Sequence, residues 1–266
     1  MLVDQSNHLE AFNSLAEKYE KYRPSYPDML FRVLETYIKE VENCNRIVDV
    51  GCGTGIATRK LYHFFGENNN IVGCEPNEDM LGCARKTNDS KKEQIDFVLS
   101  RAEKLPFENE SVKCVLTAQA IQWFERDKFY REVERILVNS GCLAILQNNR
   151  NWQENSFLQE YEEILEKYNP DYNRGYRDIQ FVNELEGSRL FHDVLYCEQR
   201  WNNKMTFNEF LGMSSSSTKA DKIIKKEGFE KYKGIIADLM NSHCDEQKLV
   251  DVSYKTELYL FRKKDK

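Results

Sequence analysis

Three glycines occupy alternate positions in the segment "IVDVGCGTGIATRKL", residues 47–61, where an apolar run passes into a helix-like pattern. They are Gly51, Gly53 and Gly55, and Asp49 lies two residues before the first of them. A glycine-rich turn between a buried strand and a helix presents bare backbone N–H groups at one edge of a parallel sheet, and glycine lets a ligand approach without a Cβ in the way. The segment therefore predicts a binding site for a nucleotide-like ligand.

The spacing of these glycines discriminates between kinds of nucleotide-binding turn. A dinucleotide fingerprint, G-x-G-x-x-G, would require a glycine where Ile56 stands. A phosphate-binding P-loop would end in G-K-[ST], and no such ending follows the turn. The alternate spacing therefore disfavours a nicotinamide-dependent dehydrogenase and a phosphate-loop enzyme, and it favours a different nucleoside ligand.

Polar residues also follow the next three strand-like runs. Glu75 ends the second run, where its carboxylate could accept hydrogen bonds from both hydroxyls of a ribose. The third run leads into "SRAEKLPF" with Glu103, at the place where an adenine ring would lie, and the fourth leads into "AQAIQWF". Four consecutive strand ends that each carry a plausible contact predict one ligand site along the same sheet edge.

Short apolar runs that alternate with helical patterns predict the framework that positions these residues. We expect an α/β fold with a doubly wound, mostly parallel, seven-stranded Rossmann-like sheet, whose last strand is antiparallel because residues 250–260 alternate between apolar and polar. A helical cap would come from the N-terminus and from an insertion after the fifth strand. The serine stretch 214–217 is expected to be a loop.

The whole chain, residues 1–266, is interpreted as a single domain with four parts. Residues 1–43 would form an N-terminal helical lid and residues 44–150 the cofactor-binding core. Residues 151–188 would form the cap insertion, and residues 189–266 the C-terminal strands and helices.

Composition limits the partners of the chain. A net charge of -6 and the lack of a basic stripe argue against nucleic acid, and no apolar run is long enough to cross a bilayer. The eight cysteines are scattered without a C-x-x-C pair, so we expect reduced core residues and no metal site. A cytoplasmic location is the default, and both a monomer and a dimer stay open.

The motifs "DVGCGTG", "EPNEDML", "AEKLPF" and "AQAIQWF" resemble those of class I S-adenosylmethionine-dependent methyltransferases. Together with the opening "FNSLAEKYEKYRPSYP", they are similar to the trans-aconitate methyltransferase-like group of small-molecule enzymes, over about residues 10–150. Two positions depart from that group. Gln122 stands where relatives often have histidine, and Arg101 stands where they often have an acidic or small residue.

The resemblance implies that the cofactor is S-adenosylmethionine. The residues expected to bind it are Tyr22, Arg23, Asp49, Gly51, Gly53, Gly55, Glu75, Pro76, Met80, Ala102, Glu103 and Gln119. The residues expected on the substrate side are Trp123, Arg150, Tyr176 and Ser214.

Methyl transfer from a sulfonium is an in-line displacement that mainly requires alignment and the exclusion of water. An acceptor carboxylate is already ionised at neutral pH, whereas a hydroxyl or ammonium acceptor would need a base. No histidine lies in the motif loops, and we assign no catalytic residue. We therefore expect methyl transfer to a small molecule, preferably O-methylation of a carboxylate. The alternatives are methylation of a hydroxyl, amine or carbon of a specialised metabolite, and nucleoside binding without catalysis.

Overall fold

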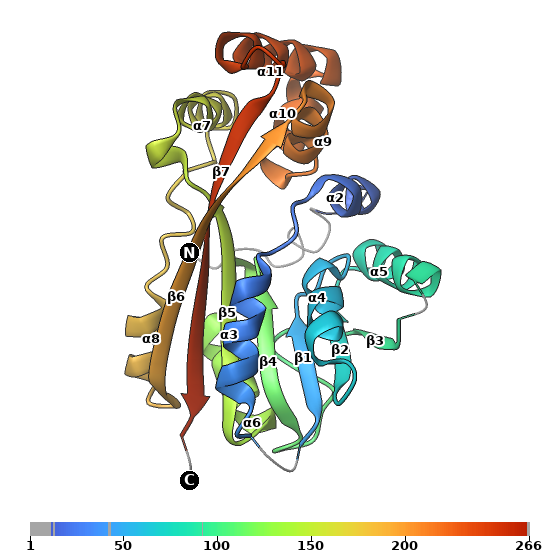
Figure 1. Cartoon of the computed structure of the whole chain (residues 1–266), viewed down its shortest axis with the longest axis vertical. Coiled ribbons are helices and arrows are strands. Elements are labelled where there is room, and N and C mark those ends of the chain that lie inside the picture. Colours follow the sequence, from blue (N-terminus) through green and yellow to red (C-terminus); the bar gives the residue numbers. More distant parts are fainter. Residues whose placement is uncertain (1–11, 13, 42–43, 92, 265–266) are drawn as a thin grey trace.

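One seven-stranded sheet forms the centre of the molecule in the computed structural model, which describes residues 12, 14–41, 44–91 and 93–264 (Figure 1). The strand order is β3-β2-β1-β4-β5-β7-β6. The first five strands are parallel, and β7 is antiparallel to both of its neighbours. This arrangement confirms the predicted doubly wound sheet with an antiparallel last strand.

The strands are β1 (Arg46–Val50), β2 (Asn70–Glu75), β3 (Ile95–Leu99), β4 (Val112–Ala118), β5 (Leu137–Arg150), β6 (Phe191–Met205) and β7 (Val250–Lys263). The helices of the described residues are α2 (Ala16–Tyr22), α3 (Asp28–Ile38), α4 (Ile56–Phe65), α5 (Glu78–Lys91), α6 (Arg126–Ile136), α7 (Ser156–Tyr168), α8 (Phe181–Ser188), α9 (Phe207–Ser215), α10 (Thr218–Glu227) and α11 (Phe229–His243), with short 3-10 turns η1 (Ile121–Trp123) and η2 (Trp152–Glu154).

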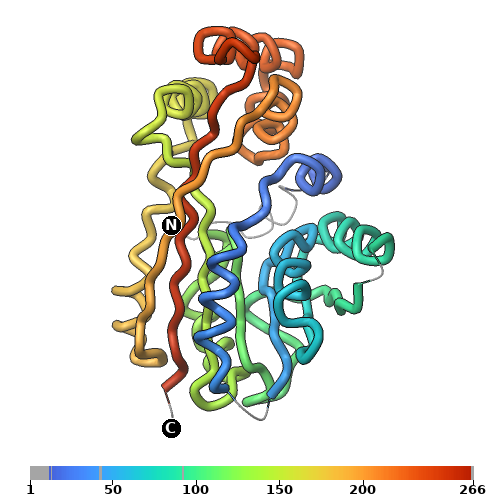
Figure 2. The backbone as a smooth tube through the Cα atoms, in the orientation of Figure 1, coloured from blue at the N-terminus to red at the C-terminus, as the bar shows by residue number. Residues whose placement is uncertain are grey.

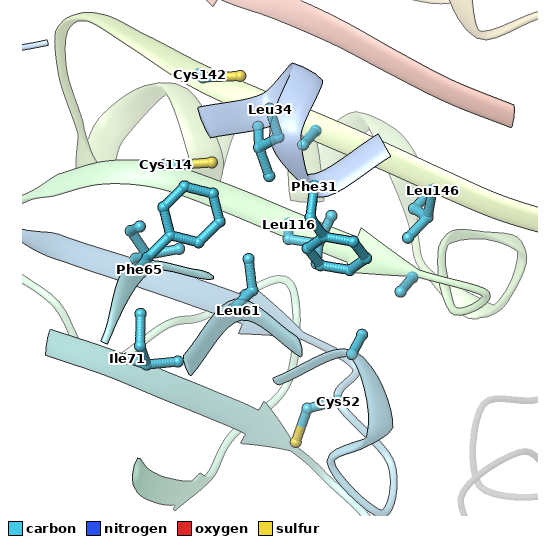
Figure 3. Close-up of a cluster of buried hydrophobic side chains, with 14 of the residues drawn as sticks. Phe31, Leu34, Cys52, Leu61, Phe65, Ile71, Cys114, Leu116, Cys142 and Leu146 are labelled. Carbon is cyan, nitrogen blue, oxygen red and sulfur yellow. The ribbon is translucent and has the colours of Figure 1, made fainter. Parts of the chain in front are cut away.

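Alternation along the strands divides the core between the two faces of the sheet. In β1, Ile47 packs with α3, α4 and α5, and Val48 packs with α6 and α8 on the opposite face. Figure 3 shows the first of these clusters, where Phe31 of α3 and Leu61 of α4 meet over the strands. Both faces are covered, which explains why the parallel strands are mainly apolar.

A second layer of helices lies beyond one end of the long strands. Helices α7, α9, α10 and α11 share a separate apolar cluster with the upper parts of β6 and β7 (Figures 1 and 2). Helix α2 lies between this cap and α4 and α5. Its Tyr22 ring packs against Gly212 of α9, where an added Cβ would lie only 2.6 Å from the ring. The end of the sheet at which β1 to β4 stop is therefore bordered by helices from both chain ends.

The serine stretch 214–217 differs from the predicted loop. Ser214 and Ser215 are the last residues of α9, and Ser217 caps α10 by accepting a hydrogen bond from the backbone N–H of Ala220 at 3.2 Å. The Ser214 hydroxyl donates to the carbonyl of Leu211, three residues earlier, at 3.2 Å. Serine side chains that bond to the local backbone at helix ends allow two helices to join without an exposed loop.

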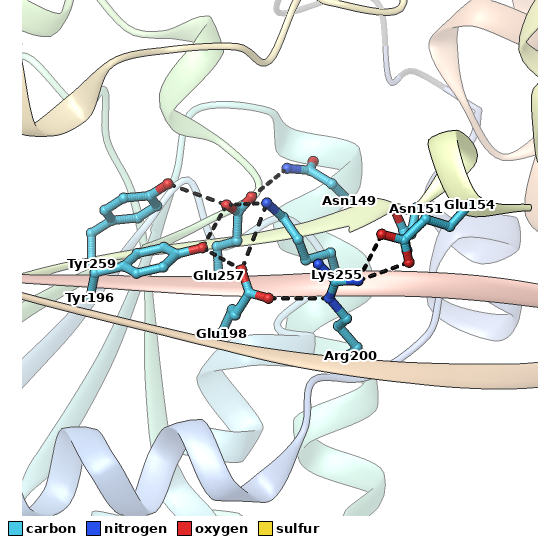
Figure 4. Close-up of polar contacts among 9 residues, drawn as sticks. All are labelled: Asn149, Asn151, Glu154, Tyr196, Glu198, Arg200, Lys255, Glu257 and Tyr259. Atoms are coloured by element: carbon cyan, nitrogen blue, oxygen red, sulfur yellow. Dashed lines mark hydrogen bonds and ion pairs between the residues drawn. The ribbon is translucent and has the colours of Figure 1, made fainter.

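The outer strands carry charged side chains on the face that the helices leave uncovered. Glu198 of β6 is paired in register with Glu257 of β7, and the two carboxylates are held by cations (Figure 4). The Lys255 ammonium lies 2.9 Å from a Glu257 oxygen, and the Arg200 guanidinium 3.2 Å from a Glu198 oxygen. This network explains the apolar–polar alternation from which the half-covered β7 was predicted.

Among the described residues, no helix is both long and apolar enough to span a membrane. The same residues contain no cluster of three or more potential metal ligands. All eight cysteines are free. Four of them are buried core residues as predicted, Cys52, Cys74, Cys114 and Cys142, and the other four are only partly buried.

Leu61→Ala should lower the free energy of unfolding by about 2–5 kcal/mol, because the Leu61 side chain is fully buried and its loss leaves a cavity. His63→Ala, on the exposed side of the same helix, should change it by less than about 0.5 kcal/mol. Urea titration followed by circular dichroism measures both. Equal effects of the two substitutions would contradict the packing of α4 against the sheet.

Candidate active site

The glycine turn between β1 and α4 adopts the left-handed conformation at all three of its glycines. The φ angles are 72° at Gly51, 57° at Gly53 and 85° at Gly55. An added Cβ at Gly51 would lie 2.5 Å from the Ala120 side chain, whereas no atom lies within 4 Å of the corresponding position at Gly53. Gly51 is therefore required by the packing of the protein on itself. Gly53 is the glycine that leaves open space for a ligand.

Glu75 fastens this turn to the end of β2. One of its carboxylate oxygens accepts the backbone N–H of Gly53 and the other accepts that of Asn77, each at 2.9 Å. Burial raises the pKa of Glu75, and the two backbone N–H groups oppose this by stabilising the carboxylate. The carboxylate faces the cavity described below while its inner lone pairs hold the turn.

Asp49 lies beneath the turn and is fully buried. One of its oxygens accepts the Thr58 hydroxyl of α4 at 2.7 Å, and the other has no hydrogen-bond partner among the described residues. Burial raises the pKa of Asp49 to about 7. Asp49 does not line the cavity. Its side chain contacts α4 behind the turn, and the turn itself forms the cavity wall at this point.

A cavity opens at the carboxyl ends of β1, β2, β3 and β4, and we call it the main cavity. It lies where ligands bind in open α/β sheets. The predicted site residues that line it are Arg23, Gly51, Gly53, Glu75, Pro76, Met80, Ala102, Glu103, Gln119, Trp123 and Arg150. These residues come from α2, five strand ends and the turns that follow them, so the fold brings most of the predicted set to one place.

Five of the predicted residues do not line the main cavity; Tyr176 lines a neighbouring cavity described below, and the other four line neither. Asp49 and Gly55 lie behind the turn, where a Cβ at Gly55 would meet Phe97 and Arg59 at 3.0 Å. The Tyr22 ring faces the cap, and the Ser214 hydroxyl is turned to a backbone carbonyl in α9. These four positions were predicted from motif position alone, which does not reveal the direction of a side chain.

A smaller cavity adjoins the main one, and we call it the side cavity. The two share part of their walls, including Arg23, Trp123, Arg150 and Arg177. Tyr176, predicted on the substrate side, lines the side cavity and not the main one. The sequence analysis did not select Lys219, which also lines it, because a lysine just after a serine stretch carries no motif.

The wall of the side cavity contains four basic residues and no acidic one: Arg23, Arg150, Arg177 and Lys219. Arg150 is neutralised, because its guanidinium lies 2.7 Å from the buried carboxylate of Glu162. The other three have no carboxylate partner among the described residues.

Neutral groups accept the hydrogen bonds of two of these cations. Arg23 donates to the Ser216 hydroxyl at 2.9 Å, and Arg177 donates to the Asn149 side-chain oxygen at 3.0 Å. The Arg177 Nε atom is buried without a partner among the described residues. The side cavity therefore carries uncompensated positive charge.

Comparison with known proteins adds an independent line of observation. A family model described as a methyltransferase domain matches residues 48–145. Over 265 residues the chain is 27% identical to a Dictyostelium discoideum protein provisionally named a methyltransferase, with 96% of this chain and 95% of the relative covered. The protein is an S-adenosylmethionine-dependent methyltransferase. Its matched segment contains the glycine turn, Glu75, Glu103 and Gln119.

Solved structures agree with this assignment at the level of the fold. One from Anaeromyxobacter dehalogenans, provisionally named a type II methyltransferase, has a TM-score of 0.62 at 22% identity and covers 91% of this chain and 98% of its own. A phosphoethanolamine N-methyltransferase 2 of Haemonchus contortus in complex with S-adenosyl-L-methionine has a TM-score of 0.56 at 18% identity, covering 99% and 61% respectively.

The main cavity of the methyltransferase fits its cofactor, S-adenosylmethionine. The open space at Gly53 and the position of Glu75 in the cavity wall suit a nucleoside with an amino-acid tail. Gln119 directly follows β4 with a positive φ of 59°, and its side-chain nitrogen has no partner among the described residues. Such an unused donor beside the cavity is consistent with a bound polar ligand.

Glu75→Ala should weaken the binding of S-adenosylhomocysteine about tenfold or more, because it removes a charge-assisted acceptor and loosens the Gly53 turn. Isothermal calorimetry on the purified methyltransferase measures the dissociation constant. Glu78→Ala, at an exposed position in the first turn of α5, is the control and should bind normally. Unchanged affinity of the Glu75 variant would contradict its assignment to the cofactor site.

Asp49→Asn should stabilise the ligand-free methyltransferase relative to wild type as pH rises. Because the pKa of Asp49 is higher in the native state than in the unfolded state, the native state stays protonated to a higher pH. The free energy of unfolding of wild type therefore falls between about pH 4 and pH 7, by at most about 1.4 kcal/mol per pH unit. Urea titrations at pH 5, 6, 7 and 8 should show a difference that grows up to about pH 7 and is then constant. The exposed Asp96→Asn is the control, and a parallel response of the two variants would refute the assignment.

Proposed function

We propose that this methyltransferase transfers the methyl group of S-adenosylmethionine to a carboxylate oxygen of a small organic acid. The observation that carries the proposal is the wall of the side cavity, which has four basic residues, no acidic residue, and only one cation that an internal carboxylate neutralises. Buried or partly buried charges without a counter-ion are costly, and an anionic acceptor would supply the missing partner. We also keep the prediction that the chain is related to the trans-aconitate methyltransferase-like group.

The cofactor supplies a methyl group that its own sulfonium has already activated. The task left to the protein is to hold an oxygen in line with that carbon and to exclude water. Arg23 and Arg177 would orient the carboxylate from the cap side, and Trp123 would close the space between the two cavities. We infer that the backbone of the glycine turn, Glu75 and the residues around Glu103 hold the rest of the cofactor.

A carboxylate acceptor also agrees with the positions of the described histidines. His63 is exposed on α4, His192 is paired with Asp193 on β6, and His243 is paired with Glu160 of α7. None of the three lines either cavity. His8 lies outside the described residues. An ionised carboxylate with a reference pKa near 4 needs no proton acceptor at neutral pH.

The relatives do not decide which atom is methylated. The Haemonchus contortus structure is that of an N-methyltransferase, and a Pseudomonas fluorescens relative, 29% identical over 144 residues, is named a C-methyltransferase of ubiquinone and menaquinone biosynthesis. Amine, hydroxyl and carbon acceptors are therefore the outcomes against which the carboxylate proposal is tested.

A panel of small carboxylic acids, phenols, alcohols and amines, each incubated with methyl-labelled S-adenosylmethionine, tests the proposal. We expect label in a product that mild base hydrolyses, because methyl esters are base-labile, whereas ethers and methylamines are not. Transfer confined to amines, hydroxyls or carbon would refute the proposal.

Arg177→Met should then raise the acceptor KM about tenfold or more, through loss of a cation from the side cavity. Steady-state kinetics with the most active acid of the panel measures the effect. The matched control is Arg200→Met, since Arg200 is an exposed arginine that pairs with Glu154 on the outer strands. Identical kinetics of the Arg177 variant and wild type would contradict the role of this cation.

A further inference from the structure

Lys219, the second residue of α10, reaches from the cap to two aromatic rings at the boundary of the side cavity. Its Nζ atom lies 4.2 Å from the centroid of the Tyr176 ring and 5.2 Å from that of Trp123. The Arg177 guanidinium carbon also lies 5.0 Å from the Tyr176 centroid. Aromatic faces attract cations, so these rings hold the ammonium at the cavity wall. No carboxylate of the described residues forms an ion pair with it.

The other charged and titratable groups that face Lys219 do not change their charge near neutral pH. Arg23 of α2, Arg177 and Arg150 are guanidinium groups, which stay protonated. The carboxylate behind Arg150 is that of Glu162, which also accepts the Tyr172 hydroxyl at 2.6 Å. Burial raises the pKa of Tyr172, so this phenol stays neutral. The described titratable groups of this wall that are not guanidinium groups are Lys219, Tyr172, Tyr176 and Tyr19 of α2, and we attribute the pH dependence to Lys219 and Tyr176.

Lys219 packs over the ring of Tyr176, and the pKa of each group is shifted into the mildly alkaline range. Burial lowers the pKa of Lys219 to about 8, with Tyr176 opposing this and Arg177 adding to it. Burial by itself would raise the pKa of Tyr176, but the charges of Arg177 and Lys219 outweigh it and lower that pKa to about 8. Whichever group releases the proton, the pair passes from a net charge of +1 to zero near pH 8.

We propose that Lys219, packed over the ring of Tyr176, is the specificity-determining cation that binds the acidic group of the acceptor and loses this ability in mildly alkaline solution. This inference rests on the proposed function and assigns it a residue and a pH dependence. The acceptor carboxylate stays ionised from pH 6 upward, so the change comes from the protein. Arg23 and Arg177 keep their charges, which leaves a weaker, pH-independent attraction above pH 9.

Citrate is a suitable probe, because it offers carboxylates without assuming the identity of the acceptor. We would titrate it into the methyltransferase loaded with S-adenosylhomocysteine, by calorimetry at pH 7.0 and pH 9.0. Wild type should bind citrate at pH 7.0 and lose about tenfold in affinity at pH 9.0. Lys219→Met should bind about tenfold more weakly at pH 7.0 and show little further change at pH 9.0.

Two further variants separate charge from packing. The double variant Lys219→Arg/Tyr176→Phe should bind as wild type does at pH 7.0 and keep its affinity at pH 9.0, because neither guanidinium nor a phenylalanine ring titrates there. Lys222→Met, on an exposed face of the same helix, is the matched control and should behave as wild type at both pH values. Affinity for S-adenosylhomocysteine should be the same in all variants.

Several outcomes would overturn the inference: no binding of citrate by wild type, the same affinity in Lys219→Met, or the same loss at pH 9.0 in the double variant Lys219→Arg/Tyr176→Phe. The acceptor panel keeps this test separate from the proposed function. If citrate binds through Lys219 but no acid is esterified, the proposed function is refuted and the anion site is supported. If an acid is esterified equally well by wild type and Lys219→Met, the proposed function is supported and the role of Lys219 is refuted.

Discussion

The hydrogen bond between the Gly53 backbone and the Glu75 carboxylate is the constraint on which the ligand site depends. It holds a left-handed turn of β1–α4 against the end of β2, so two adjacent strands present one rigid surface. The same carboxylate holds the first residues after β2 through the Asn77 N–H. A flexible turn would lose conformational entropy each time a ligand binds. Because the hydrogen bond to Glu75 already orders the turn, that cost is reduced.

The sheet, the glycine turn and Glu75 could be predicted because short sequence patterns indicate them. Apolar runs, alternate glycines and an acid at a strand end are properties of short segments, and parallel strands carry them to one edge. Side-chain direction was harder to predict. Tyr22 and Ser214 lie in the expected segments yet face the cap, because helix packing decides which side of α2 and α9 meets the cavity.

The acceptor side could not be predicted to the same degree, since its wall is assembled from residues far apart in the chain. Arg23, Arg177 and Lys219 come from the N-terminal helix, the segment after α7 and the start of α10. No short pattern links them, and only the tertiary fold shows that they share a cavity without a carboxylate. Arg150 illustrates the converse case: its position was predicted, but its pairing with Glu162 was not.

Helix α2 connects the two halves that border the cavities. Glu20 forms an ion pair with Arg59 of α4 at 2.5 Å, and two residues later Tyr22 rests on Gly212 of the cap, immediately before Arg23. A side chain larger than hydrogen at position 212 would press on that ring and shift the neighbouring guanidinium. If the side cavity holds the acceptor as proposed, substitutions at position 212, which lines neither cavity, would alter acceptor preference from a distance while the wall of the main cavity keeps its residues.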